Sequence, residues 1–209
     1  AVKAGYVTKK DTISVTEDTE KPITMEKAPE STRKDVSAAW KNFRNSDDNM
    51  GITSAKTPTS EATTYEKWFK KLGSGWGAAP SVQIIVDNSL IVMSANHIYK
   101  LDLNTGDILQ TGDMVAATNF GYTPPTYADG MIFAPLADGR VQAFNAETLE
   151  SLWVYQDMLK GQSLSPITYS DGYIYTGFWN AETKDANYVC IPVTDEDPTN
   201  TQEAKEAAW

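Results

Sequence analysis

Cysteine and histidine are almost absent from this sequence of 209 residues, which contains one of each. The single cysteine, Cys190, excludes an internal disulfide framework. Cys190 lies within a run of β-forming residues, where a small buried apolar side chain is the expected role. His97 is the only side chain available to a histidine-dependent mechanism. Its position at the turn into an apolar run predicts an exposed hairpin residue.

The residue patterns of common enzymes are also missing from the sequence. It contains no Ser/His/Asp pattern, no Cys or His cluster at metal-binding spacing, and no glycine-rich phosphate loop between a strand and a helix. The carboxylates that can be placed fall on turns, where turn geometry explains them without acid–base chemistry. No catalytic residue and no metal ligand is therefore predicted.

An excess of positive charge and long apolar runs are absent as well. The 18 basic and 28 acidic residues give a net charge of −10, which argues against a nucleic-acid backbone as partner. No apolar run approaches the roughly 20 residues that cross a bilayer, and the first residues lack a basic-then-apolar signal pattern. The 41% hydrophobic content is enough for one or two ordinary domains.

One short pattern is written three times in the second half of the sequence. Each copy places an Asp-centred turn before an apolar run, and the turns begin at Asp87, Asp129 and Asp171. The spacing from each Asp to the next is 42 residues, within the range of roughly 40 to 50 residues for a propeller blade. Glycine follows the Asp at Gly130 and Gly172, as expected for a turn residue with positive φ.

Each copy predicts four strands joined by tight turns. In the second copy, residues 131–134 are apolar at successive positions, which indicates a strand with both faces covered. Propeller blades meet that condition because each sheet lies between two neighbours. In the third copy a polar stretch, residues 180–187, precedes Tyr188, and we expect it to form an extended loop between the second and third strands.

Two strand-and-turn segments, residues 101–106 and 143–148, resemble the repeat of the PQQ-binding-like β-propeller family. That resemblance implies a tryptophan on the outermost strand that docks against the neighbouring blade. Trp153 matches it, with Trp68 as the equivalent before the first copy and Trp209 after the third. The first copy has Ile108-Leu109 in its place.

The repeats therefore predict an all-β chain whose residues 39–209 form about three four-stranded blades of a partial β-propeller. Three blades do not close a ring, since propellers typically need four to eight. Two interpretations follow: these residues are a fragment of a longer chain, or another copy completes the ring. An open fragment would leave sheet edges exposed, and self-association is one way to cover them.

The resemblance also raises the question of a cofactor. Quinoprotein dehydrogenases of the family bind pyrroloquinoline quinone with calcium and a catalytic Asp, commonly with a vicinal cysteine pair. This chain has one cysteine and no recognisable metal shell, so no cofactor is expected.

Asn45, Asp47 and Asn49 have the start of a calcium-loop spacing, but Met50 and Lys56 stand where Gly and Glu belong. An Asx-rich turn that bonds its own backbone is the alternative.

Aromatic residues at or near strand ends and loops form the candidate ligand site. Such side chains suit a platform for a sugar or a peptide, and they equally suit packing between blades. The residues are Trp76, Phe120, Tyr122, Phe178 and Trp179.

Residues 1–28 lie outside the repeat. Ile13 with Val15 and Ile23 with Met25 predict one apolar face of an antiparallel hairpin, which must pack on something because a lone hairpin is marginal in water. The segment resembles the last strands of carboxypeptidase-regulatory-like and PEGA β-sandwich modules, which occur in bacterial surface proteins.

Residues 29–38 are the expected linker. At the other end, residues 203–208 favour helix locally, whereas the repeat register places Trp209 in an outer strand.

These features favour a non-catalytic binding or scaffolding propeller region of a secreted or cell-surface bacterial protein, in the cell envelope or outside the cell. Its expected partner is a protein or a carbohydrate. Two alternatives follow from the resemblance: a quinoprotein-type oxidoreductase whose site is completed by missing blades, or a scaffold like the outer-membrane assembly lipoproteins that share the repeat.

Overall fold

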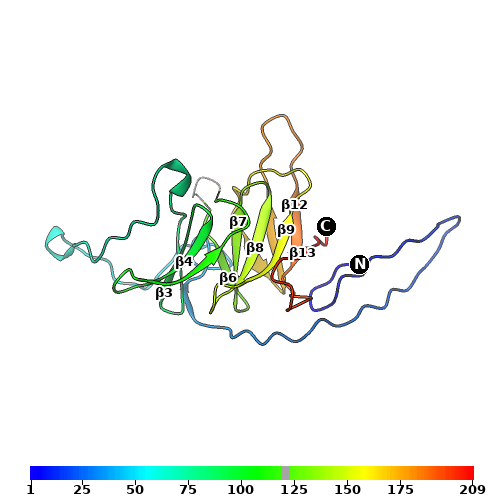
Figure 1. Ribbon diagram of the computed structural model, residues 1–209, viewed down its shortest axis with the longest axis horizontal. Helices are drawn as coiled ribbons and strands as arrows, with labels where there is room; N and C mark the ends of the chain where they lie inside the picture. Colours follow the sequence, from blue (N-terminus) through cyan, green and yellow to red (C-terminus); the bar gives the residue numbers. More distant parts are fainter. Residues whose placement is uncertain (119–122) are drawn as a thin grey trace.

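The computed structural model describes residues 1–118 and 123–209 of the chain. Three sheets follow one another along the sequence and stand side by side (Figure 1). The first sheet has the order β1-β2-β3-β4-β5. Its strands are β1 (Ala38–Trp40), β2 (Ile84–Val86), β3 (Ser89–Ser94), β4 (His97–Asp102) and β5 (Ile108–Asp113). Short 3-10 helices, η1 (Glu61–Thr63) and η2 (Trp76–Ala78), lie in the long connection between β1 and β2.

The second sheet lies in the middle and has the order β13-β9-β8-β7-β6. Its strands are β6 (Thr126–Ala128), β7 (Met131–Leu136), β8 (Arg140–Asn145), β9 (Ser151–Gln156) and β13 (Glu203–Lys205). The third sheet has the order β10-β11-β12, with β10 (Thr168–Ser170), β11 (Tyr173–Gly177) and β12 (Tyr188–Pro192). The all-β partial propeller predicted from the sequence is confirmed.

The three Asp-centred turns share one backbone geometry. Both central residues have positive φ, with values of 48° and 54° for Asp87 and Asn88, 50° and 70° for Asp129 and Gly130, and 49° and 80° for Asp171 and Gly172. The residues that flank each turn pair directly with each other. These are therefore two-residue hairpins of the type whose twist matches that of the strands.

Strand β7 is the centre of the core, and all six of its residues are buried. Its side chains alternate between two apolar clusters. Ile132 packs with Ile84 and Ile98 of the first sheet, whereas Phe133 packs with Ile174 and Ile191 of the third sheet. The prediction that this apolar run is covered on both faces is confirmed.

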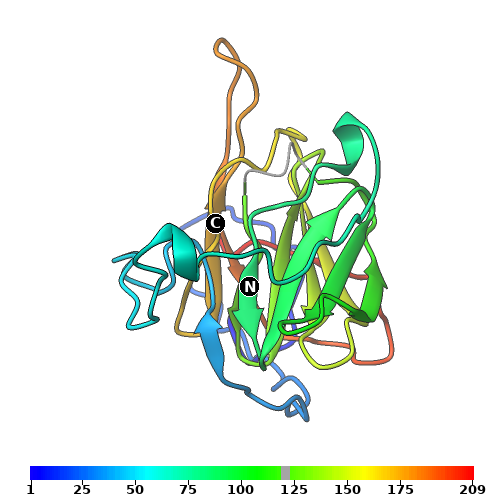
Figure 2. The same ribbon diagram turned by 90° about the vertical axis from the view of Figure 1, so that its left-hand side faces the viewer.

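The third sheet differs from the other two. Residues 180–187 form the expected loop between β11 and β12 and project from one end of the sheets (Figure 2). The end of the chain runs beside β12: Ala208 N donates to the Cys190 carbonyl at 2.7 Å, and Cys190 N donates to the Trp209 carbonyl at 3.1 Å. The local helix preference of residues 203–208 is overridden, because residues 203–205 form β13 and pair in parallel with β9.

Residues 1–28 extend out from the sheets and return, as the blue segment in Figure 1 shows. An isolated antiparallel bridge joins Tyr6 and Lys27 at the base, and Lys21 pairs with Asp11 at 2.6 Å further out. The strands expected at residues 11–15 and 22–25 are not formed in the described structure. A hairpin without a sheet to pack on is too weak to hold a regular ladder. Within the described ranges, no helix has the length and apolar character to cross a membrane.

Candidate functional site

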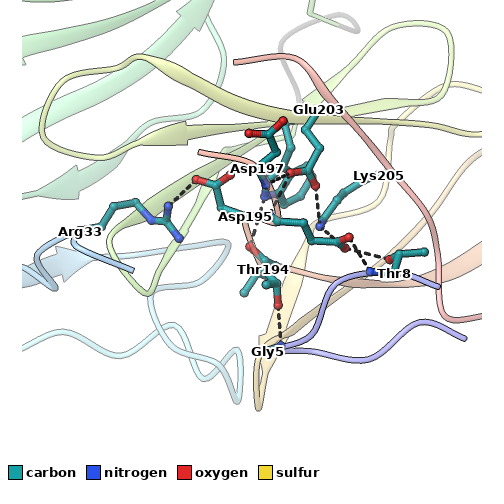
Figure 3. Close-up of polar contacts among 11 residues, drawn as sticks. Gly5, Thr8, Arg33, Thr194, Asp195, Asp197, Glu203 and Lys205 are labelled. Carbon is teal, nitrogen blue, oxygen red and sulfur yellow. Dashed lines mark hydrogen bonds and ion pairs between the residues drawn. The ribbon is translucent and has the colours of Figure 1, made fainter. Parts of the chain in front are cut away.

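Polar side chains gather where the N-terminal segment meets the end of the third sheet (Figure 3). The chain leaves β12 towards Thr194 and Glu196, and the N-terminal segment donates hydrogen bonds to both. Gly5 N lies 2.7 Å from Thr194 Oγ1. Thr8 donates from N to Glu196 Oε2 at 2.6 Å and from Oγ1 to Glu196 Oε1 at 2.8 Å. We call the residues of this cluster the clasp: Gly5, Thr8, Arg33, Thr194, Asp195, Glu196, Glu203 and Lys205.

Lys205 is the centre of the clasp. Parallel pairing of β13 with β9 turns alternate side chains to one side, so Glu203 and Lys205 are buried while Ala204 is exposed. Lys205 Nζ lies 2.8 Å from Glu196 Oε1 and 2.9 Å from Glu203 Oε1, and its side chain is 1% exposed. A buried ammonium of this kind requires its carboxylate partners, because an unpaired charge in the interior is strongly destabilising.

Glu196 is held in its ionised form by these contacts. Burial raises the pKa of the Glu196 carboxyl, but the hydrogen bonds from Lys205 and Thr8 lower it, and the net pKa is below its ordinary value. Glu203 Oε2 in turn accepts from the backbone nitrogens of Glu196 at 2.9 Å and Asp197 at 2.6 Å. The carboxylates of Glu196 and Glu203 are thus occupied by donors of the same chain.

The expected linker also belongs to the clasp. Arg33 Nη1 lies 2.8 Å from Asp195 Oδ2, and both side chains are nearly buried. Arg33 Nε and Asp195 Oδ1 have no hydrogen-bond partner in the described structure. The pair joins Arg33 of the expected linker to the residue that follows Thr194 after the third sheet.

A hollow of about 490 Å³ lies between residues 29–33 and the turns of the second and third sheets. The residues that line this hollow include four acidic ones, Glu30, Asp129, Glu150 and Asp195, and the basic residue Arg33. The balance of charge favours a cationic group over an anionic one.

A second hollow has a volume of about 360 Å³. In two successive repeats, a tyrosine hydroxyl that lines it donates to a carboxylate. Tyr127 OH donates to Asp35 Oδ1 at 2.6 Å, and Tyr169 OH donates to Asp129. The pKa of both tyrosines is raised to about 12. Burial is the larger cause, and the hydrogen bond to the carboxylate is the second. The turn residue Asp129 therefore has a structural partner in the next sheet.

The structure separates the aromatic residues that the sequence grouped as a platform. Trp76 lies in η2 and is 82% exposed, and Trp179 is 47% exposed. Phe178 is buried and stacks on Tyr155 with ring centroids 6.2 Å apart. Phe178 therefore belongs to the packing between sheets and not to an exposed platform. Phe120 and Tyr122 lie outside the described residues.

A different aromatic group lies on the outer face of the third sheet. The ring of Trp209 stacks on Tyr188 at 6.3 Å and lies 6.2 Å from Tyr175. The repeat register predicts an outer strand at Trp209 but gives no contact between Trp209 and these tyrosines. The available signal was the period-two alternation of β11 and β12, which turns Tyr175 and Tyr188 away from the core side chains Ile174 and Val189.

The repeat tryptophans form contacts between repeats. Trp153 is buried and donates from Nε1 to the Val193 carbonyl at 3.2 Å. Trp68 donates from Nε1 to the Leu103 carbonyl at 3.1 Å. The strand expected to begin at Trp68 is not formed in the described structure, because no strand lies beside it to pair with.

The remaining candidates have local partners. Asn45 Nδ2 donates to the Ile52 carbonyl at 2.9 Å, and Asp47 accepts from Lys41 at 2.6 Å. His97 Nδ1 lies 3.0 Å from Asp113 Oδ1 but forms no hydrogen bond in the described structure, and Cys190 is buried in β12. In the described ranges, no three His, Cys, Asp or Glu residues are grouped to hold a metal ion.

The repeats of this chain match a known protein family. A family model described as outer membrane protein assembly factor BamB matches residues 59–179, more than half of the 209 residues. The chain belongs to this family. No curated protein matches the chain.

The fold of this BamB-family chain is similar to those of two solved enzymes. One is the quinohemoprotein alcohol dehydrogenase ADHIIG from Pseudomonas putida HK5, with 16% identity, a TM-score of 0.61, and coverage of 82% of this chain and 26% of that one. The other is the quinohemoprotein alcohol dehydrogenase from Comamonas testosteroni, with 16% identity, a TM-score of 0.57, and coverage of 81% and 26%. The chain spans about a quarter of the length of each enzyme, and the likeness shows a shared fold.

Proposed function

We propose that this BamB-family chain is a non-catalytic binding or scaffolding propeller region of a secreted or cell-surface bacterial protein. One observation carries the proposal. Lys205 is buried and pairs with both Glu196 and Glu203, of which Glu203 is buried and Glu196 partly buried. Groups arranged in this way hold segments of chain in place and are not free to act on a substrate.

The partner in this proposal is a protein or a carbohydrate. Trp76 and Trp179 supply exposed aromatic area, which suits either partner because aromatic rings combine a large apolar face with low conformational entropy. The test measures binding of the chain to a panel of envelope proteins and glycans, with Trp76→Ala/Trp179→Ala as the variant. Tyr65→Ala, which removes another exposed aromatic ring, is the matched control. Equal binding by all three proteins would contradict a role for the two tryptophans.

The second candidate function is a quinoprotein-type oxidoreductase, favoured by the fold likeness to the two alcohol dehydrogenases. The resemblance implies a quinone held with calcium, a catalytic Asp and commonly a cysteine pair. The described residues do not fit that group, because the one cysteine is buried within β12 and Asp47 is paired with Lys41. The measurement is a thermal shift with pyrroloquinoline quinone and calcium. The oxidoreductase function predicts a rise in Tm by mass action, and the binding function predicts no change.

The third candidate, favoured by the family match, is an assembly scaffold of the cell envelope. In that role the projecting loop, residues 180–187, is a natural contact surface because most of it is exposed. Replacement of the loop by a short turn should abolish capture of an envelope partner while Tm stays unchanged. Undiminished capture would favour a purely structural role. The expectation that residues 1–28 are the last strands of a β-sandwich module stays a prediction.

A further inference from the structure

Two segments of this chain have backbone groups without a backbone partner in the described structure, and we propose that these segments join one copy of the protein to the next. The first is the outer edge of β5 in the first sheet. The second is the arm, which we define as residues 10–25. In the inferred contact, the arm of one copy adds as a strand to β5 of a second copy.

The outer edge of β5 is open, unlike those of the other two sheets. Strand β13 covers the edge of β9, and residues 208–209 cover the edge of β12 through two backbone hydrogen bonds. Among the described strands, β5 pairs only with β4. Ile108 and Leu109 are exposed on β5. An open edge with exposed apolar residues is a template for strand addition.

The arm has the properties of a strand without a sheet. Within the described chain, no hydrogen bond between backbone groups involves residues 10–25. Ile13 and Val15 alternate with polar residues, and both are exposed, as is Ile23 on the returning half of the arm. Unpaired backbone groups and an unpacked apolar face both gain from an added neighbour.

The arm and β5 of one copy cannot reach each other. The first sheet lies at one end of the molecule, and the arm extends from the other end beyond β13 (Figure 1). The base of the arm is fixed there, because Thr8 is bonded to Glu196. A β5 edge that the arm reaches must therefore belong to a second copy.

Strand addition at such an edge already occurs inside this chain. Residues 203–205 add to the outer strand of the second sheet in parallel and bury two of their three side chains. Strand β5 has six residues, and residues 11–16 supply a matching length of about 20 Å at 3.3 Å per residue. The contact between arm and edge joins two different surfaces, so it is head-to-tail and need not stop at a dimer.

The first test measures the weight-average mass of the 209-residue chain by sedimentation over a concentration series. We expect the mass to rise above the 23.0 kDa of one copy. The variant Ile13→Lys/Val15→Lys should raise the Kd of association by about tenfold or more, which corresponds to at least 1.4 kcal/mol. The matched control, Thr12→Lys/Ser14→Lys, adds the same charges to the opposite side of the same arm and should leave the Kd nearly unchanged.

The second test uses complementation between the two surfaces. Ile108→Lys/Leu109→Lys alters only exposed side chains on the edge strand, and an unchanged Tm will verify its fold. At protein concentrations between the original Kd and the raised Kd, each variant alone should be largely monomeric. A mixture of the arm variant and the edge variant retains one intact arm and one intact edge, so it should form pairs and stop at twice the monomer mass.

Two results would overturn the proposal. One is a chain that remains monomeric at every soluble concentration, in which case the apolar face of the arm is covered by something other than β5, such as the rest of a β-sandwich module. The other is association that the arm variant and its control affect equally. Neither result would alter the proposed binding or scaffolding function.

Discussion

The indole nitrogen of Trp153 donates to the carbonyl oxygen of Val193, which lies 40 residues further along the chain, at 3.2 Å. Trp68 makes the equivalent bond to Leu103 at 3.1 Å. Each carbonyl belongs to the residue that directly follows the third strand of the next repeat, which is β12 for Val193 and β4 for Leu103. Each of these tryptophans thus joins one repeat to the following sheet by a directed hydrogen bond, and the ring is buried at Trp153 and half-buried at Trp68.

The first prediction concerns this contact. Trp153→Ala should lower the free energy of unfolding by about 3–5 kcal/mol, because it leaves a large cavity between the second and third sheets. Trp153→Phe should cost less, about 1–3 kcal/mol, because it keeps apolar volume but leaves the Val193 carbonyl without its donor. Chemical denaturation measures both values.

Trp76→Ala is the control for this measurement. Trp76 is 82% exposed, so its replacement should change the unfolding free energy by no more than about 0.5 kcal/mol. A similar loss for Trp76→Ala and Trp153→Ala would contradict the assigned role of Trp153.

The second prediction concerns Lys205. Lys205→Met should destabilise the protein by about 3–5 kcal/mol, because it leaves the buried Glu203 and the partly buried Glu196 without their cation. Lys10→Met removes a pair with Glu206 whose two side chains are exposed, and it should cost about 1 kcal/mol or less. Thermal unfolding of both variants checks the difference. Equal Tm values would show that the buried pairs contribute no more than the surface pair.

The third prediction is a loss of stability in acid. The folded pKa of Glu196 lies below its ordinary value, so folding favours the ionised form. This stabilisation is present above the unfolded pKa of about 4.3 and is lost as the pH falls through the folded pKa. Tm should therefore decrease below about pH 4.5, and Glu196→Gln should have a lower Tm at neutral pH with a flatter acid profile. Identical acid profiles for the two proteins would exclude Glu196 as the titrating group.

The fourth prediction tests the position of Trp68. A Cβ at Gly106 would lie 2.5 Å from Trp68 Cε3, and Gly106 has a φ of 72°. Gly106→Ala should therefore combine backbone strain with displacement of the indole, and it should shift the tryptophan fluorescence. Gly75 has a φ of 76° and a ψ of 179°, with no atom within 4 Å of a Cβ, so Gly75→Ala should show only the strain of this glycine-favoured conformation, about 1–3 kcal/mol. An unchanged emission spectrum in Gly106→Ala would place Trp68 elsewhere.

The hairpin turns and the core strand could be predicted because their causes are local. Asp129 and Gly130 both have positive φ, which these residue types tolerate. Residues 131–134 are apolar in succession, and a strand of that composition needs cover on both faces. Such information lies within a few neighbouring residues, so it can be read without knowing what the strand packs against.

The clasp could not be predicted in the same way. Thr8 and Glu196 are 188 residues apart, and no periodicity connects them. Residues 203–205 favour helix on local propensity, yet the open edge of β9 provides hydrogen-bond partners for a strand, and tertiary pairing overrides the preference. Phe178 likewise became a packing residue because Tyr155 of the second sheet lies beside it.

The amino-acid sequence by itself determined the repeat, the turn types and the all-β class, since each depends on side-chain size and backbone freedom at adjacent positions. Only the tertiary structure decided which charges are buried together, which sheet edges are covered and which aromatic rings are exposed. The physical reason is that burial and pairing are properties of shared space, and segments distant in the chain share that space only after folding.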